Sequence, residues 1–511
     1  MPERWRSVVD ILRGAYPAGL RVVRGASHQA SRLAKLVAAD LRKPHSFSRR
    51  LLMSLAIGLT LESLLHVLHG HPRLEAAEDA AMDWTIGLYR GVAPRRAQPK
   101  AFTYVDIDDD TFEAWGAPAS VPRDRLASLV EAVASARPAM VIVDVDVSGE
   151  VPNAGDQVLS RYLGGYGAAQ EGRRVSPLIF ARGQRASGPM PRGEDHAKLR
   201  EPRPSFLDAV LADQPQVSLA SSLFELDADG VIRRWRLWEP VCVGDGEAGH
   251  VEIIPSIQLL AAGLVVEPQS SARELEQRIR EGVAGSERRP CGSPDELAPS
   301  GSETHGPGRR QLDLGHLRLS VPPSRLGQRI VYRYASFSEL RSGERYPLDR
   351  ANGEELLSVV SARPITEGLS VSRELLENRI VVIGGGFAEG RDVHRTPLGP
   401  MPGGLIIVNA IDSLLEYGEI KPLSAPWRYG VLTAGVLVLS VLFPCFGSLT
   451  AALIASLLLL AILLPSSVVF FKDGYWIDFS IPFIAVLLHR YAAEIHERMA
   501  THSPPRATAA P

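Results

Sequence analysis

The sequence predicts an α/β domain with a partly parallel sheet, joined to an α-helical transmembrane part. The run from Tyr429 to Phe471 contains no charged residue, and such a length suffices for two membrane-crossing helices. Strand-like segments alternate with an amphipathic helix between residues 102 and 147. The chain has 511 residues, of which 45% are hydrophobic, and its net charge of −2 gives no indication of a nucleic-acid partner.

The N-terminal 50 residues are rich in arginine and lysine and precede the apolar stretch at residues 51–69. The basic region is too long for a cleaved signal peptide, so we expect residues 51–69 to form an uncleaved transmembrane helix. Glu62 and His66 inside it are expected at an interface or against other helices. By the positive-inside rule, residues 1–50 form a basic cytoplasmic segment.

Residues 70–425 are then expected on the opposite side of the membrane as one large domain. A helical pattern at Ala76–Leu88 is followed by a strand at Phe102–Asp108. Pro122-Arg123 opens an amphipathic helix, and a second strand follows at Ala139–Val147. This order predicts a βαβ unit, with the two strands paired in parallel through a right-handed crossover.

The rest of the domain mixes polar stretches with short regular elements. We expect polar surface insertions at about residues 181–204 and 267–312. The Asp229-Gly230 pair predicts a hairpin between two strands. Further elements are predicted by apolar patterning: a helix at Ile257–Leu264, strands at Arg329–Tyr334 and Arg379–Ile383, and a helix at Leu405–Tyr417.

The C-terminal part predicts transmembrane helices at 427–443 and 448–471, separated by a turn near Pro444 and Gly447. The shorter apolar segment 475–491 is predicted as a further crossing, with an interfacial helix as the alternative. Residues 492–511 would then be a short cytoplasmic tail. With four crossings, the protein is expected to be a multi-pass protein of the inner (plasma) membrane, with an extracytoplasmic, periplasmic main domain.

Two predicted strands end in acidic side chains, Asp106 and Asp108 on the first and Asp144 on the second. Carboxyl ends of strands are where α/β folds place their sites. The alternative is that these acids cap helices and pair with Arg123 or Arg125. The Gly384–Gly386 run lacks the glycine that a dinucleotide fingerprint needs at its sixth position, Glu389. We find no motif of a catalytic nucleophile, metalloprotease or P-loop and predict no enzymatic activity, no cofactor and no metal.

The three cysteines are Cys242, Cys291 and Cys445. Their spacing matches neither a zinc site nor a disulfide framework. Cys242 and Cys291 can pair if their domain faces an oxidising compartment, and the sequence leaves this open.

The order of these elements resembles the CHASE2 family, an extracytoplasmic sensory domain of bacterial membrane receptors. The resemblance covers about residues 75–420. It rests on four stretches: Val105 to Gly116 with Pro122-Arg123, Ala139–Val147, Asp227–Arg234, and Ile380–Gly384 followed by Asp392, Thr396-Pro397 and Val408–Leu415. One helix before the domain and about three after it also fit the layout of the family.

The resemblance implies a sensor that binds a small-molecule or protein signal outside the cell and takes part in signal transduction. The candidate ligand-binding residues lie near strand ends or in the loops that follow them: Asp106, Asp108, Arg123, Asp144, Asp392 and Thr396. Family receptors usually carry a signalling module after the last helix. None follows here, so we expect a cytoplasmic or membrane partner in trans, and a homodimer remains open.

Two other functions remain open from the sequence. One is a membrane-anchored, metal-dependent phosphohydrolase that uses Asp106, Asp108 and Asp144. The other is a structural membrane subunit that docks a cytoplasmic partner through residues 1–50 and the tail.

Overall fold

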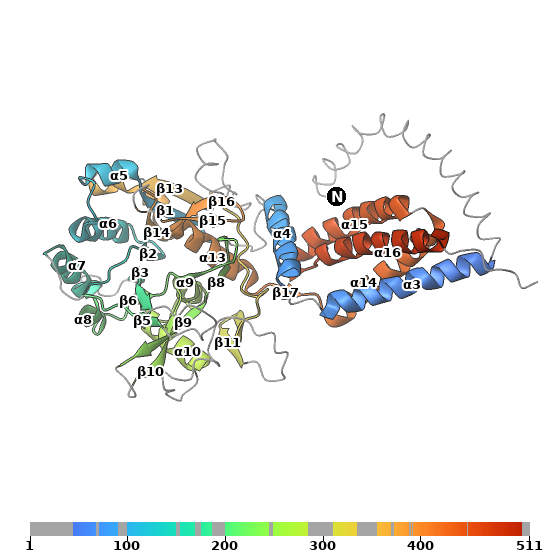
Figure 1. The fold of residues 1–511 in the computed structure, drawn as a ribbon. Coiled ribbons are helices and arrows are strands. Elements are labelled where there is room, and N and C mark those ends of the chain that lie inside the picture. The colour runs from blue at the N-terminus through green and yellow to red at the C-terminus, as the bar shows by residue number, and fades with distance from the viewer. Residues whose placement is uncertain are drawn as a thin grey trace, which may run out of the picture. The chain divides into compact units, whose positions relative to one another are not determined.

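The computed structural model describes most of the chain outside its two ends: residues 44–67, 71–89, 100–149, 154–168, 175–186, 200–244, 249–284, 310–334, 355–368, 373–387, 390, 392–446 and 448–502. These residues fall into two compact units. The α/β unit takes in Met82–Pro422 and Val468–Trp476, and the helical unit contains the remainder. The predicted basic segment lies almost wholly outside the described residues. The units are described separately (Figure 1).

A six-stranded parallel sheet forms the centre of the α/β unit. Its order is β13 (Leu357–Ser361), β1 (Phe102–Ile107), β14 (Ile380–Gly385), β2 (Met140–Asp144), β3 (Leu178–Ala181) and β6 (Val217–Ala220). The sequence predicted β1 and β2 as a direct pair, but β14 lies between them. The consecutive residues Ile380 to Ile383 are all fully buried, which suits a central strand covered on both faces.

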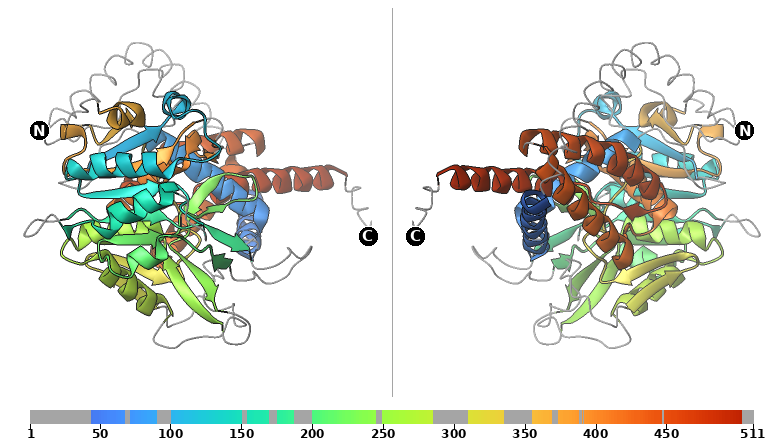
Figure 2. Two further views of the ribbon diagram at one scale, coloured as in Figure 1. Left: turned by 90° about the vertical axis from the view of Figure 1, so that its left-hand side faces the viewer. Right: turned by 90° about the vertical axis from the view of Figure 1, so that its right-hand side faces the viewer.

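Helices cover both faces of this sheet. On one face, the apolar side chains of α6 (Arg123–Ser135), α7 (Ala154–Gly164) and α12 (Ala362–Thr366) share a core with Val105, Val143 and Ile383. On the other face, α13 (Gly403–Tyr417) packs on β14 and β1 and beside α9 (Ile257–Val266). The left-hand view of Figure 2 looks onto the α6 and α7 layer, with the strands behind it.

Smaller elements complete the α/β unit. A second sheet has the order β10 (His250–Pro255), β9 (Trp238–Val243), β5 (Arg200–Pro202) and β4 (Gln184–Ala186). The predicted Asp229-Gly230 hairpin is confirmed as β7 (Phe224–Leu226) and β8 (Ile232–Trp235). The remaining elements are the part of α4 (Pro72–Tyr89) that begins at Met82, α5 (Asp109–Ala114), α8 (Asp208–Leu211), α10 (Ala272–Ala284), β11 (Arg310–Leu314), β12 (Leu317–Val321), the 3₁₀ helix η3 (Arg373–Leu375), β15 (Val393–Thr396), β16 (Gly399–Pro402), β17 (Lys421–Pro422) and β18 (Tyr475–Trp476).

Two stretches differ from the sequence analysis. The predicted polar insertion 267–312 contains α10, because Ala272, Leu275, Ile279 and Val283 form a buried stripe at helical spacing. In the other predicted insertion, 181–204, the described residues form β4 and β5.

The predicted strand Arg329–Tyr334 is a buried extended segment without a named strand. Its amides are satisfied largely by side chains of α13. Val331 N donates to Ser413 Oγ at 3.0 Å, and Arg333 N and Tyr334 N both donate to Asn409 Oδ1 at 2.9 Å.

The helical unit contains α3 (Pro44–Val67), α14 (Ala425–Cys445), most of α15 (Ser448–Lys472) and α16 (Ser480–His502). By length and hydropathy, Pro426–Cys445 and Ser448–Lys472 can each cross a membrane, whereas the apolar stretch of α3, Leu51–Leu61, is shorter. The segment predicted as a helix at 475–491 begins as β18, and its helix starts only at Ser480. Asp478 explains this start, because its carboxylate accepts from Ser480 N at 2.8 Å.

Candidate ligand site at the carboxyl edge of the sheet

Two carboxylates lie in one row across the carboxyl ends of three neighbouring strands. Asp106 on β1 is in register with Gly384 on β14, and Gly384 is in register with Asp144 on β2. Two strand spacings separate the aspartates by about 10 Å between Cα atoms. Their neighbours Val105 and Val143 belong to the core on the α6 side, so the two carboxylates point to the α13 face.

Glycines let the first turn of α13 lie directly on this row. A Cβ added at Gly384 would stand 3.5 Å from Gly404 Cα and 3.0 Å from Tyr104 Oη. One added at Gly404 would stand only 2.6 Å from Tyr104 Cε2. The fully buried Tyr104 ring therefore fills the space between β1 and the start of the helix.

A third carboxylate, Asp392, reaches the same helix start from the loop before β15. Gly403 N donates to Asp392 O at 3.1 Å, and a Cβ on Gly403 would stand 2.6 Å from Asp392 Oδ2. His394 Nε2 and Asp392 Oδ1 are 2.9 Å apart, and both side chains are about 40% exposed. Solvent therefore reaches the pair formed by Asp392 and His394.

Several acidic side chains and one histidine lie close together in this site, and their charges shift the pKa values within it. Burial raises the pKa of Asp144 to about 8, repulsion from Asp392 adds to the rise, and His394 opposes it. The hydrogen bond to Asp392 raises the pKa of His394 above its usual 6.5. Burial and then the charges of Asp106, Asp144 and Asp392 raise the pKa of Tyr104. We call Tyr104, Asp106, Asp144, Asp392 and His394 the carboxylate cluster.

The other predicted site residues have local roles. Asp108 caps the N-terminus of α5, accepting from Thr111 N at 2.9 Å and from Thr111 Oγ1 at 2.5 Å. Thr396 closes the turn between β15 and β16 by donating to Gly399 O at 2.7 Å.

Arg123, on α6, donates to the main-chain oxygen of Asp146 and lies 3.8 Å from Asp156 on α7. Asp156 lies in the helical layer opposite α13, and Asp146 lies in the loop after β2. The structure brings together Asp106, Asp144 and Asp392, and it leaves Asp108, Arg123 and Thr396 outside the carboxylate cluster.

Tyr104 was not among the site residues predicted from the sequence. Two signals were available: Tyr104 precedes Asp106 by two positions, which places both on one face of the strand, and the Gly403-Gly404 pair opens the helix. Within the described ranges, no group of three or more His, Cys, Asp or Glu residues is placed to hold a metal ion. This geometry gives no support to a phosphohydrolase built on Asp106, Asp108 and Asp144.

A second charged group fixes α4 in the α/β unit. Asp83 on α4 accepts from Arg233 Nε at 2.9 Å and also from Arg329. Arg233 extends the network to Asp227 at 3.0 Å and Asp229 at 2.7 Å, across the β7–β8 hairpin. We call these five residues the α4 network. Arg329 is only 1% exposed, so its charge depends on these partners.

Comparison with known proteins gives one match. The family model of the CHASE2 domain matches residues 54–443, which extends beyond the stretch of resemblance seen in the sequence and takes in most of α3 and α14. No curated protein and no solved structure matches the chain.

Proposed function

The chain belongs to the CHASE2 domain family, and on this premise we propose that it is a membrane-anchored, non-catalytic sensor. Its α/β unit binds an extracytoplasmic signal at the carboxylate cluster, and the flanking helices pass the change to a signalling partner. The observation that carries this proposal is the position of the cluster at the first turn of α13. From α13 the chain continues through β17 into α14, which is long and apolar enough to cross a membrane.

A buried segment supports transmission from the cluster. The stretch 328–334 is held by α13 through Asn409 and Ser413, and by α4 through the contact between Arg329 and Asp83. Arg333 adds an ion pair with Asp412 of α13 at 3.1 Å. A ligand that moves the start of α13 would thus alter the contacts of the segment that also holds α4, provided that it binds the two arrangements with different affinity.

Two observations support a multi-pass protein with an extracytoplasmic α/β unit. Cys242 on β9 is disulfide-bonded, a state typical of oxidising compartments; Cys291, whose pairing with it the sequence left open, lies outside the described residues. Within the helical unit, Ser54 Oγ of α3 lies 2.9 Å from His489 Nε2 of α16, and a Cβ on Gly58 would stand 2.9 Å from Val436 Cγ1 of α14. Among the described residues, α14 and α15 are the two helices long and apolar enough to cross a membrane. Crossings by α3 and α16 belong to the proposal, and reporter fusions at residues 70 and 511 test them.

The experiment on sensing uses the full-length protein in nanodiscs and a panel of periplasmic small molecules. We expect at least one compound to raise the melting temperature of the wild type and to alter a crosslink placed between α3 and α14. Asp392→Asn removes the exposed charge of the cluster and should abolish both responses. Asp124→Asn, on α6, is the matched control.

Responses that survive unchanged in both Asp392→Asn and Asp144→Asn would refute binding at the carboxylate cluster. A compound that raises the melting temperature without altering the crosslink would leave binding intact but refute transmission through α3 and α14. Photo-crosslinking in cells from the loop near Pro444 would then identify the signalling partner.

A further inference from the structure

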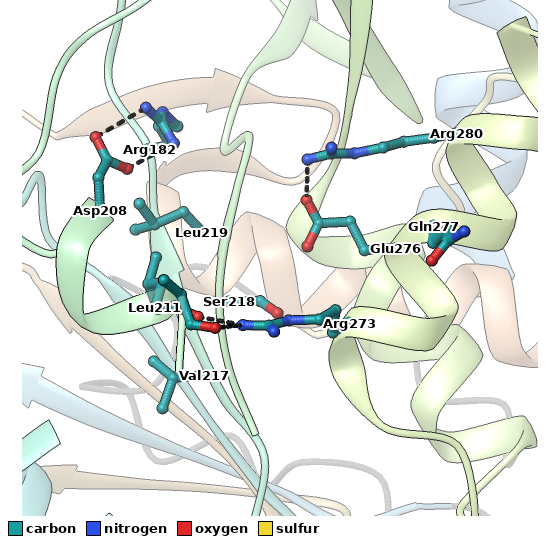
Figure 3. Close-up of a pocket in the computed structure, with 11 residues that line it drawn as sticks. Arg182, Asp208, Leu211, Val217, Ser218, Leu219, Arg273, Glu276, Gln277 and Arg280 are labelled. Atoms are coloured by element: carbon teal, nitrogen blue, oxygen red, sulfur yellow. Dashed lines mark hydrogen bonds and ion pairs between the residues drawn. The ribbon is translucent and has the colours of Figure 1, made fainter. Parts of the chain in front are cut away.

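A cavity of about 420 Å³ lies between α10 and β6, the last strand of the parallel sheet (Figure 3). This volume is within the range of small-molecule sites and exceeds what an inorganic ion needs. The cavity shares no residue with the carboxylate cluster. It is therefore a second place where a ligand can enter the α/β unit.

The spacing of polar residues on α10 places one face of the helix on this cavity. Arg273, Glu276, Gln277 and Arg280 stand at positions i, i+3, i+4 and i+7, and all four line it. The buried stripe of α10, which includes Leu275, packs inward instead. The wall opposite α10 comes from β6, which includes apolar Leu219, and from α8.

Two of the three arginines at the cavity, Arg182 and Arg280, have incomplete sets of partners. Arg182 pairs with Asp208 at 3.0 Å, and Arg280 pairs with Glu276 at 2.5 Å and with Glu252. The Nε atoms of Arg182 and Arg280 are nonetheless buried without a hydrogen-bond acceptor among the described residues. A buried N–H group without an acceptor is unfavourable. The two side chains remain 20% and 39% exposed, so a ligand oxygen can reach other N–H donors of both guanidinium groups.

Arg273 supplies a charge that carboxylates do not neutralise. It donates to the main-chain oxygens of Leu211 and Ala212, the latter at 2.8 Å, and forms no ion pair with any described residue. Asp208 and Glu276, the two acids at the cavity, are each paired with an arginine. An entering anion therefore meets a positive charge on Arg273 and acids that already have partners.

We propose that this cavity binds a small organic anion that carries at least one carboxylate or phosphate group on an apolar skeleton. Its carboxylate or phosphate oxygens accept from Arg182 and Arg280, and its skeleton contacts Leu219 and Val217. The guanidinium group suits both kinds of oxygen because it presents several N–H donors in a plane. The inference uses no residue of the carboxylate cluster and holds whether or not the cluster binds the signal.

Isothermal titration of the full-length protein in nanodiscs tests the proposal. The probes are glutarate, phthalate and phenyl phosphate, with inorganic phosphate and the neutral diamide of glutarate beside them. We expect at least one organic acid to bind and its neutral analogue to fail. Binding by the dicarboxylates alone identifies carboxylate as the ligand group, and binding by phenyl phosphate alone identifies phosphate.

Two variants change the cavity in different ways. Arg182→Gln removes one donor, whereas Ala212→Trp fills the space from an exposed position without breaking an ion pair. Each should weaken binding at least tenfold, while Arg318→Gln, which removes an exposed arginine on β12, should leave it unchanged. Melting without ligand checks that the variants fold.

The proposal is overturned if none of the organic acids binds, if the neutral diamide binds as well as glutarate, or if Ala212→Trp binds with wild-type affinity. Loss of binding in Ala212→Trp with full retention in Arg182→Gln would overturn the assigned role of that arginine. A failure of this proposal can be told apart from a failure of the proposed sensor function, because the Asp392→Asn experiment tests residues that do not line the cavity.

Discussion

The α4 network and the carboxylate cluster show two ways in which one domain uses buried charge. In the network, Asp83, Asp227 and Asp229 face Arg233 and Arg329, so opposite charges alternate. In the cluster, the charges of three aspartates act on buried Tyr104, and the pKa of Asp144 rises to about 8. The network is arranged to hold two elements together, whereas the cluster is arranged to change its charge state. Buried charges in the α4 network thus stabilise the fold, whereas those in the carboxylate cluster can change their protonation.

The largest effect is expected where the network is broken. Asp83→Asn keeps the shape of the side chain but removes the carboxylate with which both Arg233 and buried Arg329 pair, and the loss of one partner from a buried pair costs about 3–5 kcal/mol. Denaturant unfolding measures the change. Asp313→Asn, in an exposed pair with Arg318 at 3.8 Å, is the control and should change stability by less than about 0.5 kcal/mol. Equal effects of the two variants would remove the contrast between network and surface.

A change in the carboxylate cluster should raise the stability of the protein, whereas breaking the α4 network lowers it. Because the pKa of Asp144 is raised from 3.8 to about 8, the folded state binds more protons than the unfolded state between these values, and stability falls as pH rises through this window. Asp144→Asn removes the penalty. The variant should melt several degrees higher than the wild type at pH 8 and close to it near pH 4. If the melting temperatures of Asp144→Asn and the wild type differ by the same amount at every pH in this range, the raised pKa of Asp144 is contradicted.

The packing of α13 on the cluster can be tested at one glycine. Gly404→Ala places a methyl group 2.6 Å from Tyr104 Cε2, so the ring or the helix start must move, at a cost of about 1–3 kcal/mol. Gly87→Ala on α4 is the matched control, since nothing lies within 4 Å of its added Cβ. It should be neutral or slightly stabilising. Urea unfolding of the pair distinguishes a steric effect from a general effect of alanine.

The smallest effect is expected at the exposed end of the network. The hydrogen bond from Arg233 lowers the pKa of Asp229 to about 2, so its stabilisation is present above pH 4 and is lost as pH falls toward 2. Its side chain is 54% exposed, which limits the contribution to less than about 1 kcal/mol. Asp229→Asn should therefore differ from the wild type at pH 6 and converge with it near pH 2.

The sequence predicts well what depends on neighbouring residues. The strands with Asp106 and Asp144, the helix before Tyr417 and the Asp229-Gly230 hairpin all have local signals of period or turn chemistry. No local signal predicts that β14 lies between β1 and β2, because this arrangement pairs residues from opposite ends of the domain. Helix α10 was missed because its stripe of buried residues lies next to a long Gly/Pro/Arg-rich stretch.

The same limit applies to the sites. Asp106 and Asp144 were identified by their place at strand ends, but the role of Tyr104 depends on the distant Gly404. Asp108 has the residue type and the position of a site residue, yet its Thr111 contacts make it a helix cap. The cavity at α10 combines Arg182 with Arg273 and Arg280, and spacing along a chain cannot bring such residues together.

The extended segment 328–334 also has a mechanical consequence. Because α13 holds it through Asn409 and α4 holds it through Arg329, tension applied along either helix would load the same short stretch of backbone. That stretch lies in no named strand, but two backbone bonds join it to β8: Trp235 N donates to Gln328 O and Ile330 N donates to Arg233 O, both at 2.9 Å. It is therefore one buried joint at which two helices and the β7–β8 hairpin meet.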